Sequence, residues 1–354
     1  MTGCGSWMCS HERAGRLPVS ARDTLTPVVR LAPAKLNLTL AVTGRRRDGF
    51  HDLHSIMVPL ALADRLSLAR AAGRADSLHV VGGADGATTL DPAGFASVAH
   101  GIAEARRAVG RGADTFPLAV RLEKHIPIAA GLAGGSSDAA AAIDGALEAW
   151  SAELSPDDRR RAAAATGSDV PFFLADGPAL VEGRGERVTP LNGIAGSAPG
   201  ILLVTPAAEA STRAVFALFD TDPRAAPAHS GSTRLSSEHL AAELGPGYGL
   251  MDAADLVRRA GALAIANDLA PAADLLVPGL RALRRALTRL LGVPIGLSGS
   301  GPTLWALYPA LGGAEAAAMT VREQLRLGLL DSPGGGAPFV AATTIVSPPR
   351  RTPE

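Results

Sequence analysis

The stretch HIPIAAGLAGGSSDAAAAI, His125 to Ile143, places a proline and a run of glycine and alanine directly before two serines and an alanine-rich segment. From Ser136 the pattern becomes helical, because Ile143, Leu147 and Trp150 recur at i, i+4 and i+7. Small side chains leave the backbone N–H groups of the loop open, and the positive end of the following helix dipole converges on the same place. The stretch therefore predicts a phosphate-binding loop at a helix N-terminus.

Two alternatives bear on this loop. A tight turn into a closely packed helix would use the same residue types without binding anything, and the loop alone leaves that interpretation open. The two familiar nucleotide loops do not match. The Gly-Lys-Ser/Thr ending of a P-loop is missing, and no acidic residue follows about 20 positions on at the end of a second parallel strand, as a dinucleotide fold requires.

Composition favours a globular enzyme with a small-molecule partner. The chain has 354 residues, which is enough for two domains. Its 34 basic and 34 acidic residues cancel, so no polyanion-binding surface is indicated and no nucleic-acid partner is expected. No apolar run approaches the roughly 18 residues of a membrane span, so no membrane association is expected.

The first residues are predicted to lie outside the fold. Residues 1–26 lack a clean apolar core after a basic start, which argues against a signal peptide and for a disordered extension or a misplaced start codon. Both cysteines, Cys4 and Cys9, fall there, so a disulfide framework or a four-cysteine zinc site is excluded and a cytoplasmic location fits. Only two of the 34 basic residues are lysines, Lys35 and Lys124, so each of these positions could need a compact ammonium group.

The first half of the chain alternates strands and helices. Residues 28–42 read as a half-buried strand with Lys35, Asn37 and Thr39 on its polar face, and Pro33 suggests an edge or a bulge. Further elements follow in order: a turn at 48–49, a strand resuming at Ser55, a helix over 94–107, a strand over 116–128, a helix capped by Ser155 and ended by Gly167, and a hairpin over 179–191.

The small-residue segment 192–200 is the predicted domain boundary, which divides the chain into 27–195 and 196–348. The second part predicts a strand at 201–206, helices over 256–266, 280–291 and 313–327, a strand-turn-strand over 295–309 and a closing strand over 338–346. This order predicts an α+β domain with an antiparallel sheet. Residues 224–249 are rich in Pro, Gly and Ser, and we expect a long mobile loop there, either a lid or an insertion.

Three segments in order resemble the GHMP kinases, the family that includes galactokinase, homoserine kinase, mevalonate kinase and phosphomevalonate kinase. They are APAKLNLTL from Ala32, EKHIPIAAGLAGGSSDAA from Glu123 and LSGSGPTLWAL from Leu297. The resemblance runs from about Val28 to Val346. It implies an α+β fold of two domains, a ribosomal-protein-S5-domain-2-like N-terminal domain and a ferredoxin-like C-terminal domain.

The resemblance also implies ATP and Mg²⁺, with the magnesium ligands left unassigned. In the family the glycine loop binds the ATP phosphates, which carries this role to Pro127, Ile128, Ala129, Ala130, Gly131, Leu132, Ala133, Gly134, Gly135, Ser136 and Ser137. Lys124 is a further nucleotide-binding candidate, with a solvated strand-end lysine as its alternative. Asp169 in GSDVPFF is implied as the catalytic base beside Lys35, with a turn or cap aspartate as its alternative. The segment SGSGPT, Ser298 to Thr303, is expected to support the loop, or else to form a plain hairpin turn.

The segments DGFHDL and GSDVPFFL resemble one branch of the family, whose substrate is a polyol that carries a cytidine diphosphate. This implies that His51 and Phe50 contact the cytosine, with Asn37, Thr212 and Phe216 as further substrate contacts. The chain departs from the branch in several places. A lysine that often follows the phenylalanine is replaced by Ala217, and the asparagine expected near the adenine is missing from 91–94.

Ala129, Ala130 and Ala133 stand where the family usually has glycine, which the loop tolerates if these alanines have negative φ. Two other functions stay open: a different small-alcohol kinase of the family, or a non-catalytic nucleotide-binding member. The assembly is expected to be a monomer or a homodimer.

Overall fold

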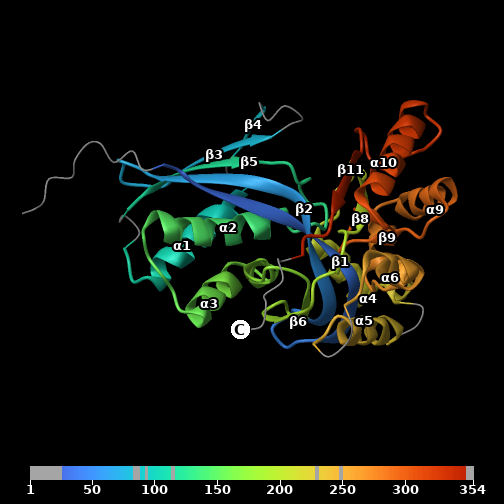
Figure 1. The fold of residues 1–354 in the computed structure, drawn as a ribbon, viewed down its shortest axis with the longest axis horizontal. Helices are drawn as coiled ribbons and strands as arrows, with labels where there is room; N and C mark the ends of the chain where they lie inside the picture. The colour runs from blue at the N-terminus through green and yellow to red at the C-terminus, as the bar shows by residue number, and fades with distance from the viewer. Residues whose placement is uncertain are drawn as a thin grey trace, which may run out of the picture.

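A computed structural model describes residues 26–82, 88–91, 95–112, 116–227, 231–246 and 250–347. The predicted extension, apart from Thr26, lies outside the described residues, as do both cysteines and most of the segment 91–94. The fold is a mixture of α and β, as predicted, and its strands form two sheets (Figure 1). Within the described part of the chain, no helix has both the length and the apolar character needed to cross a bilayer.

The larger sheet has seven strands. They are β1 (Val28–Arg45), β2 (His51–Arg70), β3 (Ser77–Gly82), β4 (Thr88–Leu90), β5 (Leu118–Glu123), β6 (Ala179–Gly183) and β7 (Arg187–Pro190), in the order β4-β3-β5-β2-β6-β7 with β1 paired to β2. Among these strand pairs only β3–β5 is parallel. The long strand β2 pairs with β5 at one end and with β6 at the other, so it spans the sheet.

Strand β1 brings the first catalytic candidate into position. Its register with β2 shifts between Pro33 and Lys35, as expected where a proline cannot donate to the ladder. The expectation of a half-buried strand is wrong, because Lys35, Asn37 and Thr39 on its polar face are at most 3% exposed. The glycine loop covers this face at Lys35, whose backbone N–H donates to Leu132 O at 3.0 Å.

Three helices cover one face of the large sheet: α1 (Ala96–Ala108), α2 (Gly134–Ala149) and α3 (Pro156–Thr166) (Figure 1). The alanine-rich sequence of α2 permits close packing, and α1 approaches it at Gly101, where a Cβ atom would lie 2.7 Å from Ala139 O. Ser155 caps α3 through the backbone N–H of Asp158, and Gly167 ends it, as predicted. This layer holds the start of α2 firmly against the sheet.

The second sheet is antiparallel, as predicted, with the order β11-β8-β10-β9. Its strands are β8 (Gly200–Thr205), β9 (Gly296–Leu297), β10 (Leu304–Tyr308) and β11 (Phe339–Thr344). The helices around it are α4 (Thr212–Thr221), α6 (Ala253–Arg258), α7 (Ala260–Ile265), α8 (Ala270–Leu276), α9 (Leu280–Leu291) and α10 (Leu311–Arg326). The single helix predicted over 256–266 is therefore two short ones, and α4 and α8 were not predicted.

The mobile loop predicted over 224–249 is wrong for most of its length. Pro223–Ala225 form a 3-10 helix, and Ser232–Glu243 form helix α5, which packs on β1. Ser237 is fully buried there and accepts a hydrogen bond from Thr39 Oγ1 at 2.7 Å. Residues 228–230 and 247–249 lie outside the described residues.

The two sheets share one cluster of buried apolar side chains. It combines Leu36 and Ile56 of the large sheet with Ile201 and Trp305 of the small one. The sheets are also joined directly, since Val346 N donates to Pro59 O at 2.8 Å. The chain passes from one sheet to the other through residues 192–200, and the division at 195/196 stays a prediction.

Candidate active site

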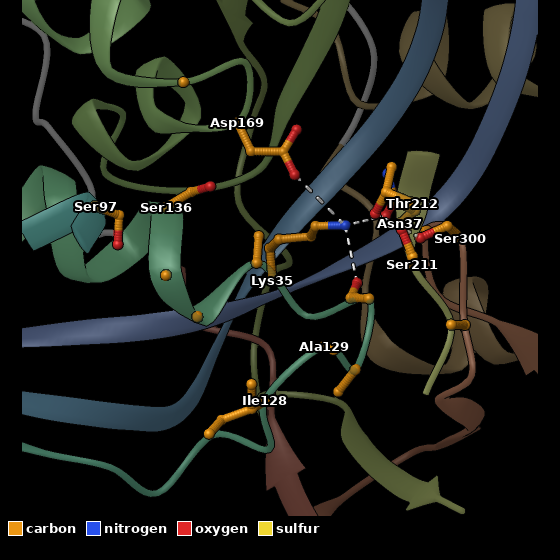
Figure 2. Close-up of a pocket in the computed structure, with 18 of the residues that line it drawn as sticks. Lys35, Asn37, Ser97, Ile128, Ala129, Ser136, Asp169, Ser211, Thr212 and Ser300 are labelled. Atoms are coloured by element: carbon orange, nitrogen blue, oxygen red, sulfur yellow. Dashed lines mark hydrogen bonds and ion pairs between the residues drawn. The ribbon is translucent and has the colours of Figure 1, made fainter. Parts of the chain in front are cut away.

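A cavity of about 490 Å³ lies where the glycine loop, β1 and the start of α4 meet. Figure 2 shows Lys35 in its middle, with Asp169, Ser97 and Ser136 on one side and Ser211, Thr212 and Ser300 on the other. The cavity therefore collects hydroxyl groups from both halves of the chain around the Lys35 ammonium group.

Lys35 is 3% exposed and has three polar neighbours. Its Nζ lies 2.5 Å from Asn37 Oδ1, 3.0 Å from Gly131 O and 4.0 Å from Asp169 Oδ2. Burial lowers the pKa of Lys35 below its ordinary value, and the nearby Asp169 carboxylate opposes that shift. The structure thus brings together the two residues that the resemblance pairs.

Asp169 lies between the end of α3 and a short 3-10 helix, η2 (Val170–Leu174), whose Val170 and Phe172 side chains are buried. These two anchors hold the loop against the core. The Asp169 side chain makes no capping hydrogen bond, and it is 31% exposed and lines the cavity. Asp169 therefore lies in the turn before η2, as its alternative interpretation has it, but its side chain does not cap η2 and the carboxylate is available to a ligand.

The glycine loop rests on the segment Ser298 to Thr303 of the second sheet. Ser298 Oγ donates to Gly131 O at 3.0 Å, and Thr303 N donates to Ala130 O at 3.4 Å. A Cβ atom at Gly131, whose φ is +74°, would lie 2.4 Å from Ser298 O. The expected support of the loop is present, and Gly131 is required because the two backbones touch there.

The expectation of negative φ in the loop is wrong at two of its three alanines. Ala129 and Ala133 both have φ of +53°, whereas Ala130 is not in the left-handed region. Ala133 is the N-cap residue of α2, and the loop needs this turn to reach the helix. Each left-handed alanine costs roughly 1–2 kcal/mol, which the surrounding contacts offset.

Most of the predicted loop residues line the cavity, namely Pro127, Ile128, Ala129, Ala130, Gly131, Ala133, Gly134, Gly135 and Ser136. Two do not. Leu132 is fully buried in the cluster that the two sheets share, and Ser137 is 1% exposed, with a hydroxyl that has no partner among the described residues. The side chains of Leu132 and Ser137 are therefore buried in the protein interior rather than exposed to the cavity.

Lys124 also lines the cavity, but it is not the solvated strand-end residue of the alternative interpretation. It is 8% exposed, and its Nζ donates to Asp138 Oδ2 at 2.7 Å and to Asp64 Oδ2. Neither carboxylate was singled out from the sequence. Asp64 lies 60 residues before Lys124, so the sequence does not show that the three charges meet.

The predicted substrate residues separate into two groups. Asn37, Thr212 and Phe216 line the cavity, whereas His51 and Phe50 do not. The His51 ring stacks on Phe216, with centroids 4.6 Å apart, and its Nε2 lies 2.7 Å from Asp220 Oδ1. His51 therefore adjoins the cavity behind Phe216.

Phe50 is 46% exposed at the surface, under the guanidinium group of Arg184. Sequence reasoning missed Ser97, Ser211 and Ser300 in the cavity wall. Ser300 lies inside the predicted support segment, which was the available signal, and isolated serines elsewhere give none. Within the described ranges, no group of three or more His, Cys, Asp or Glu side chains could hold a metal ion.

A glycine loop at a helix N-terminus, a lysine-aspartate pair and an adjoining second sheet define a small-molecule kinase of the GHMP class. Residues 97–177 match the family model described as the GHMP kinases N terminal domain. The homoserine kinase of Cytophaga hutchinsonii has the same fold, with a TM-score of 0.62 and 16% identity over 92% of this chain and 97% of that one.

Two more specific matches narrow the class. The 4-diphosphocytidyl-2-C-methyl-D-erythritol kinase of Pelotomaculum thermopropionicum is 35% identical over 300 residues, which cover 83% of this chain and 94% of the relative. A crystal structure of 4-(cytidine 5'-diphospho)-2C-methyl-D-erythritol kinase matches with a TM-score of 0.61 and 28% identity over 90% of this chain and 99% of that one. The chain belongs to the 4-diphosphocytidyl-2-C-methyl-D-erythritol kinase family.

Proposed function

We propose that this chain transfers the γ-phosphoryl group of ATP to the 2-hydroxyl of 4-diphosphocytidyl-2-C-methyl-D-erythritol, a step of the non-mevalonate route to isoprenoid precursors. The observation that carries the proposal is the Lys35–Asp169 pair, 4.0 Å apart, in the same cavity as the glycine loop. Phosphoryl transfer needs positioned phosphates, neutralised charge and an oriented hydroxyl, and the cavity has groups for each task.

The loop residues fit a triphosphate. Gly134 and Gly135 begin α2 at the cavity wall, so the N–H groups of the first helical turn are not covered by side chains. Ser136 adds a hydroxyl beside them. Mg²⁺ bound to the phosphates would neutralise the charge that develops during transfer, and in such sites it uses few protein ligands.

Asp169 is suited to be the base. As an ionised carboxylate it only accepts hydrogen bonds, so it can orient the substrate hydroxyl and take its proton as the bond to phosphorus forms. Lys35 is held by Asn37 and the Gly131 carbonyl, so its ammonium points at the same region. There it would stabilise negative charge on the attacking oxygen or on the phosphoryl group.

The cytidine end of the substrate fits the side of the cavity formed by α4. Phe216 offers an aromatic face for the base. Since the Asp220 carboxylate accepts the hydrogen of His51 Nε2, the ring atom left for the cytosine edge is Nδ1. We further propose that the protein acts in the cytoplasm, as a monomer or homodimer, without a nucleic-acid partner.

The deciding experiment is ADP release by the purified chain with ATP and Mg²⁺. Four alcohols are compared: 4-diphosphocytidyl-2-C-methyl-D-erythritol, mevalonate, homoserine and galactose. We expect turnover with the cytidylated substrate alone. Turnover with another alcohol would reassign the substrate and keep the kinase, whereas ATP binding with no turnover on any of the four would support a non-catalytic role.

A further inference from the structure

Three charged side chains are buried together beneath the nucleotide loop. Asp64 comes from β2, Lys124 follows β5, and Asp138 lies in the first turns of α2. Asp64 and Asp138 are fully buried and Lys124 is 8% exposed. Even when buried charges are paired, the cost of removing them from water can exceed the energy gained from the pair. This cluster therefore needs a reason beyond stability.

The cluster holds both ends of the loop. Asp64 Oδ1 accepts the backbone N–H of His125 at 2.5 Å and of Ile126 at 2.9 Å, just before Pro127 begins the loop. Asp138 lies in α2, four residues after Gly134, where the loop becomes a helix. Because Lys124 Nζ donates to both carboxylates, it ties the entrance of the loop to its exit.

The charges of the cluster do not balance when all three groups are ionised, because two carboxylates face one ammonium. Asp138 Oδ1 is buried and has no hydrogen-bond partner among the described residues. Burial raises the pKa of Asp138 to about 7, with Lys124 opposing the shift and Asp64 adding to it. Near neutral pH this carboxyl therefore exists in both protonation states.

No other charged group is recorded against Asp138 in the described structure. The neighbouring helix α1 contributes Gly101, which packs on Ala139, and Phe95 at its start lies 5.7 Å from Lys124 Nζ. The core around α2 adds apolar side chains. The electrostatics of Asp138 are thus set by Asp64, by Lys124 and by whatever binds at the start of α2.

We propose that Asp64, Lys124 and Asp138 are positioning residues for the nucleotide loop, and that Asp138 takes up a proton from solvent when nucleotide phosphates bind above it. The inference rests on the proposed function, in which the loop binds ATP. Arriving phosphates add negative charge near a carboxylate in a low-dielectric site, so they favour its protonated form.

By linkage, the effect works in both directions: ionisation of Asp138 weakens nucleotide binding. Nucleotide affinity therefore falls as pH rises through about 7. The fall from a single proton is at most about tenfold per pH unit.

The test is calorimetry of the full chain with a non-hydrolysable ATP analogue and Mg²⁺ at pH 7, in buffers of different ionisation enthalpy. The wild type should take up more protons per bound analogue than Asp138→Asn, by up to about one. Comparing the two proteins cancels protons released by the analogue itself. Asp144→Asn is the matched control, because Asp144 is on the same helix but pairs with Arg159 and is partly exposed, whereas Asp138 is fully buried in the cluster.

Equal proton uptake by wild type and Asp138→Asn would overturn the inference. Absence of analogue binding to the wild type would instead overturn the proposed function. If Asp138→Asn does not fold, infrared difference spectroscopy on the wild type decides the question. Binding of the analogue should then produce the C=O band of a buried protonated carboxyl, and an absent band would refute proton uptake.

Discussion

Asp169 faces Lys35 across 4.0 Å and makes no capping hydrogen bond, so its carboxylate is not committed to the start of η2. We expect Asp169→Asn to lower kcat by about 10²–10⁴-fold, the range for a lost general base, while the KM for ATP stays nearly constant. Steady-state ADP release measures both constants. Asp157→Asn on the exposed face of α3 is the control, and a loss of only a few fold in Asp169→Asn would point to another base.

Lys35 gives a prediction for alkaline pH. Burial lowers its pKa below the ordinary 10.5, so its ammonium is lost on raising the pH before that of an exposed lysine. If turnover depends on this charge, kcat should therefore begin to decline at a pH below 10.5. In Lys35→Arg the decline should disappear, because a guanidinium stays charged, although the maximal rate is lower. A kcat–pH profile with the same decline in both proteins would exclude Lys35 as its source.

For single residues, the sequence predicts those that belong to motifs and misses those that act through partners distant in the chain. Lys35 and Asp169 follow from the segments that resemble the family. Asp64 does not, because its role depends on Lys124, which is 60 residues away in the chain. The positive φ of Ala133 was also missed, since alanine normally avoids that region and only the tertiary contacts of the loop impose it.

The left-handed backbone at the start of helix α2 can be tested by substitution. Ala133 has φ of +53° as the N-cap of α2, and glycine adopts that conformation without strain. We expect Ala133→Gly to raise the free energy of unfolding by about 0.5–1 kcal/mol. This is the net value once the opposing effect, the larger conformational entropy of glycine in the unfolded chain, is subtracted. Chemical denaturation measures the change. Ala130→Gly is the control and should not stabilise, because Ala130 is not left-handed.

Helix α5 explains why one element was predicted wrongly. Its buried residues are Thr233, Ser237 and Leu240, which have the helical spacing i, i+4 and i+7. Two of the three are polar, so a search for apolar periodicity does not find them. Ser237 can be buried because β1 offers Thr39 as a hydrogen-bond partner, and that partner is visible only in the folded chain.

For the whole molecule, Gly131 is one of the points where the first half of the chain touches the second. In Gly131→Ala a Cβ would lie 2.4 Å from Ser298 O, so the two segments must separate. We expect the free energy of unfolding to fall by about 1–3 kcal/mol, as in other overpacked sites, and nucleotide affinity to fall as well. Thermal denaturation with and without an ATP analogue measures both. Gly261→Ala is the control, because no atom lies near its added methyl group, and an equally small effect of Gly131→Ala would contradict the close contact.

The antiparallel second sheet and the order of its strands could be predicted for the whole molecule, because strand patterns are local, whereas α4, α5 and α8 were missed. The shared apolar cluster could not, since Leu36 and Trp305 read as core residues of separate halves.

One carbonyl oxygen, that of Gly131, accepts hydrogen bonds from both Lys35 Nζ and Ser298 Oγ. The oxygen therefore works as a common reference point: the glycine loop, the Lys35 ammonium and the segment that follows β9 are aligned to the same atom. A displacement of the loop that breaks the bond to Ser298 also changes the position of Lys35. The position of the glycine loop and the position of the Lys35 ammonium are consequently coupled through one backbone carbonyl.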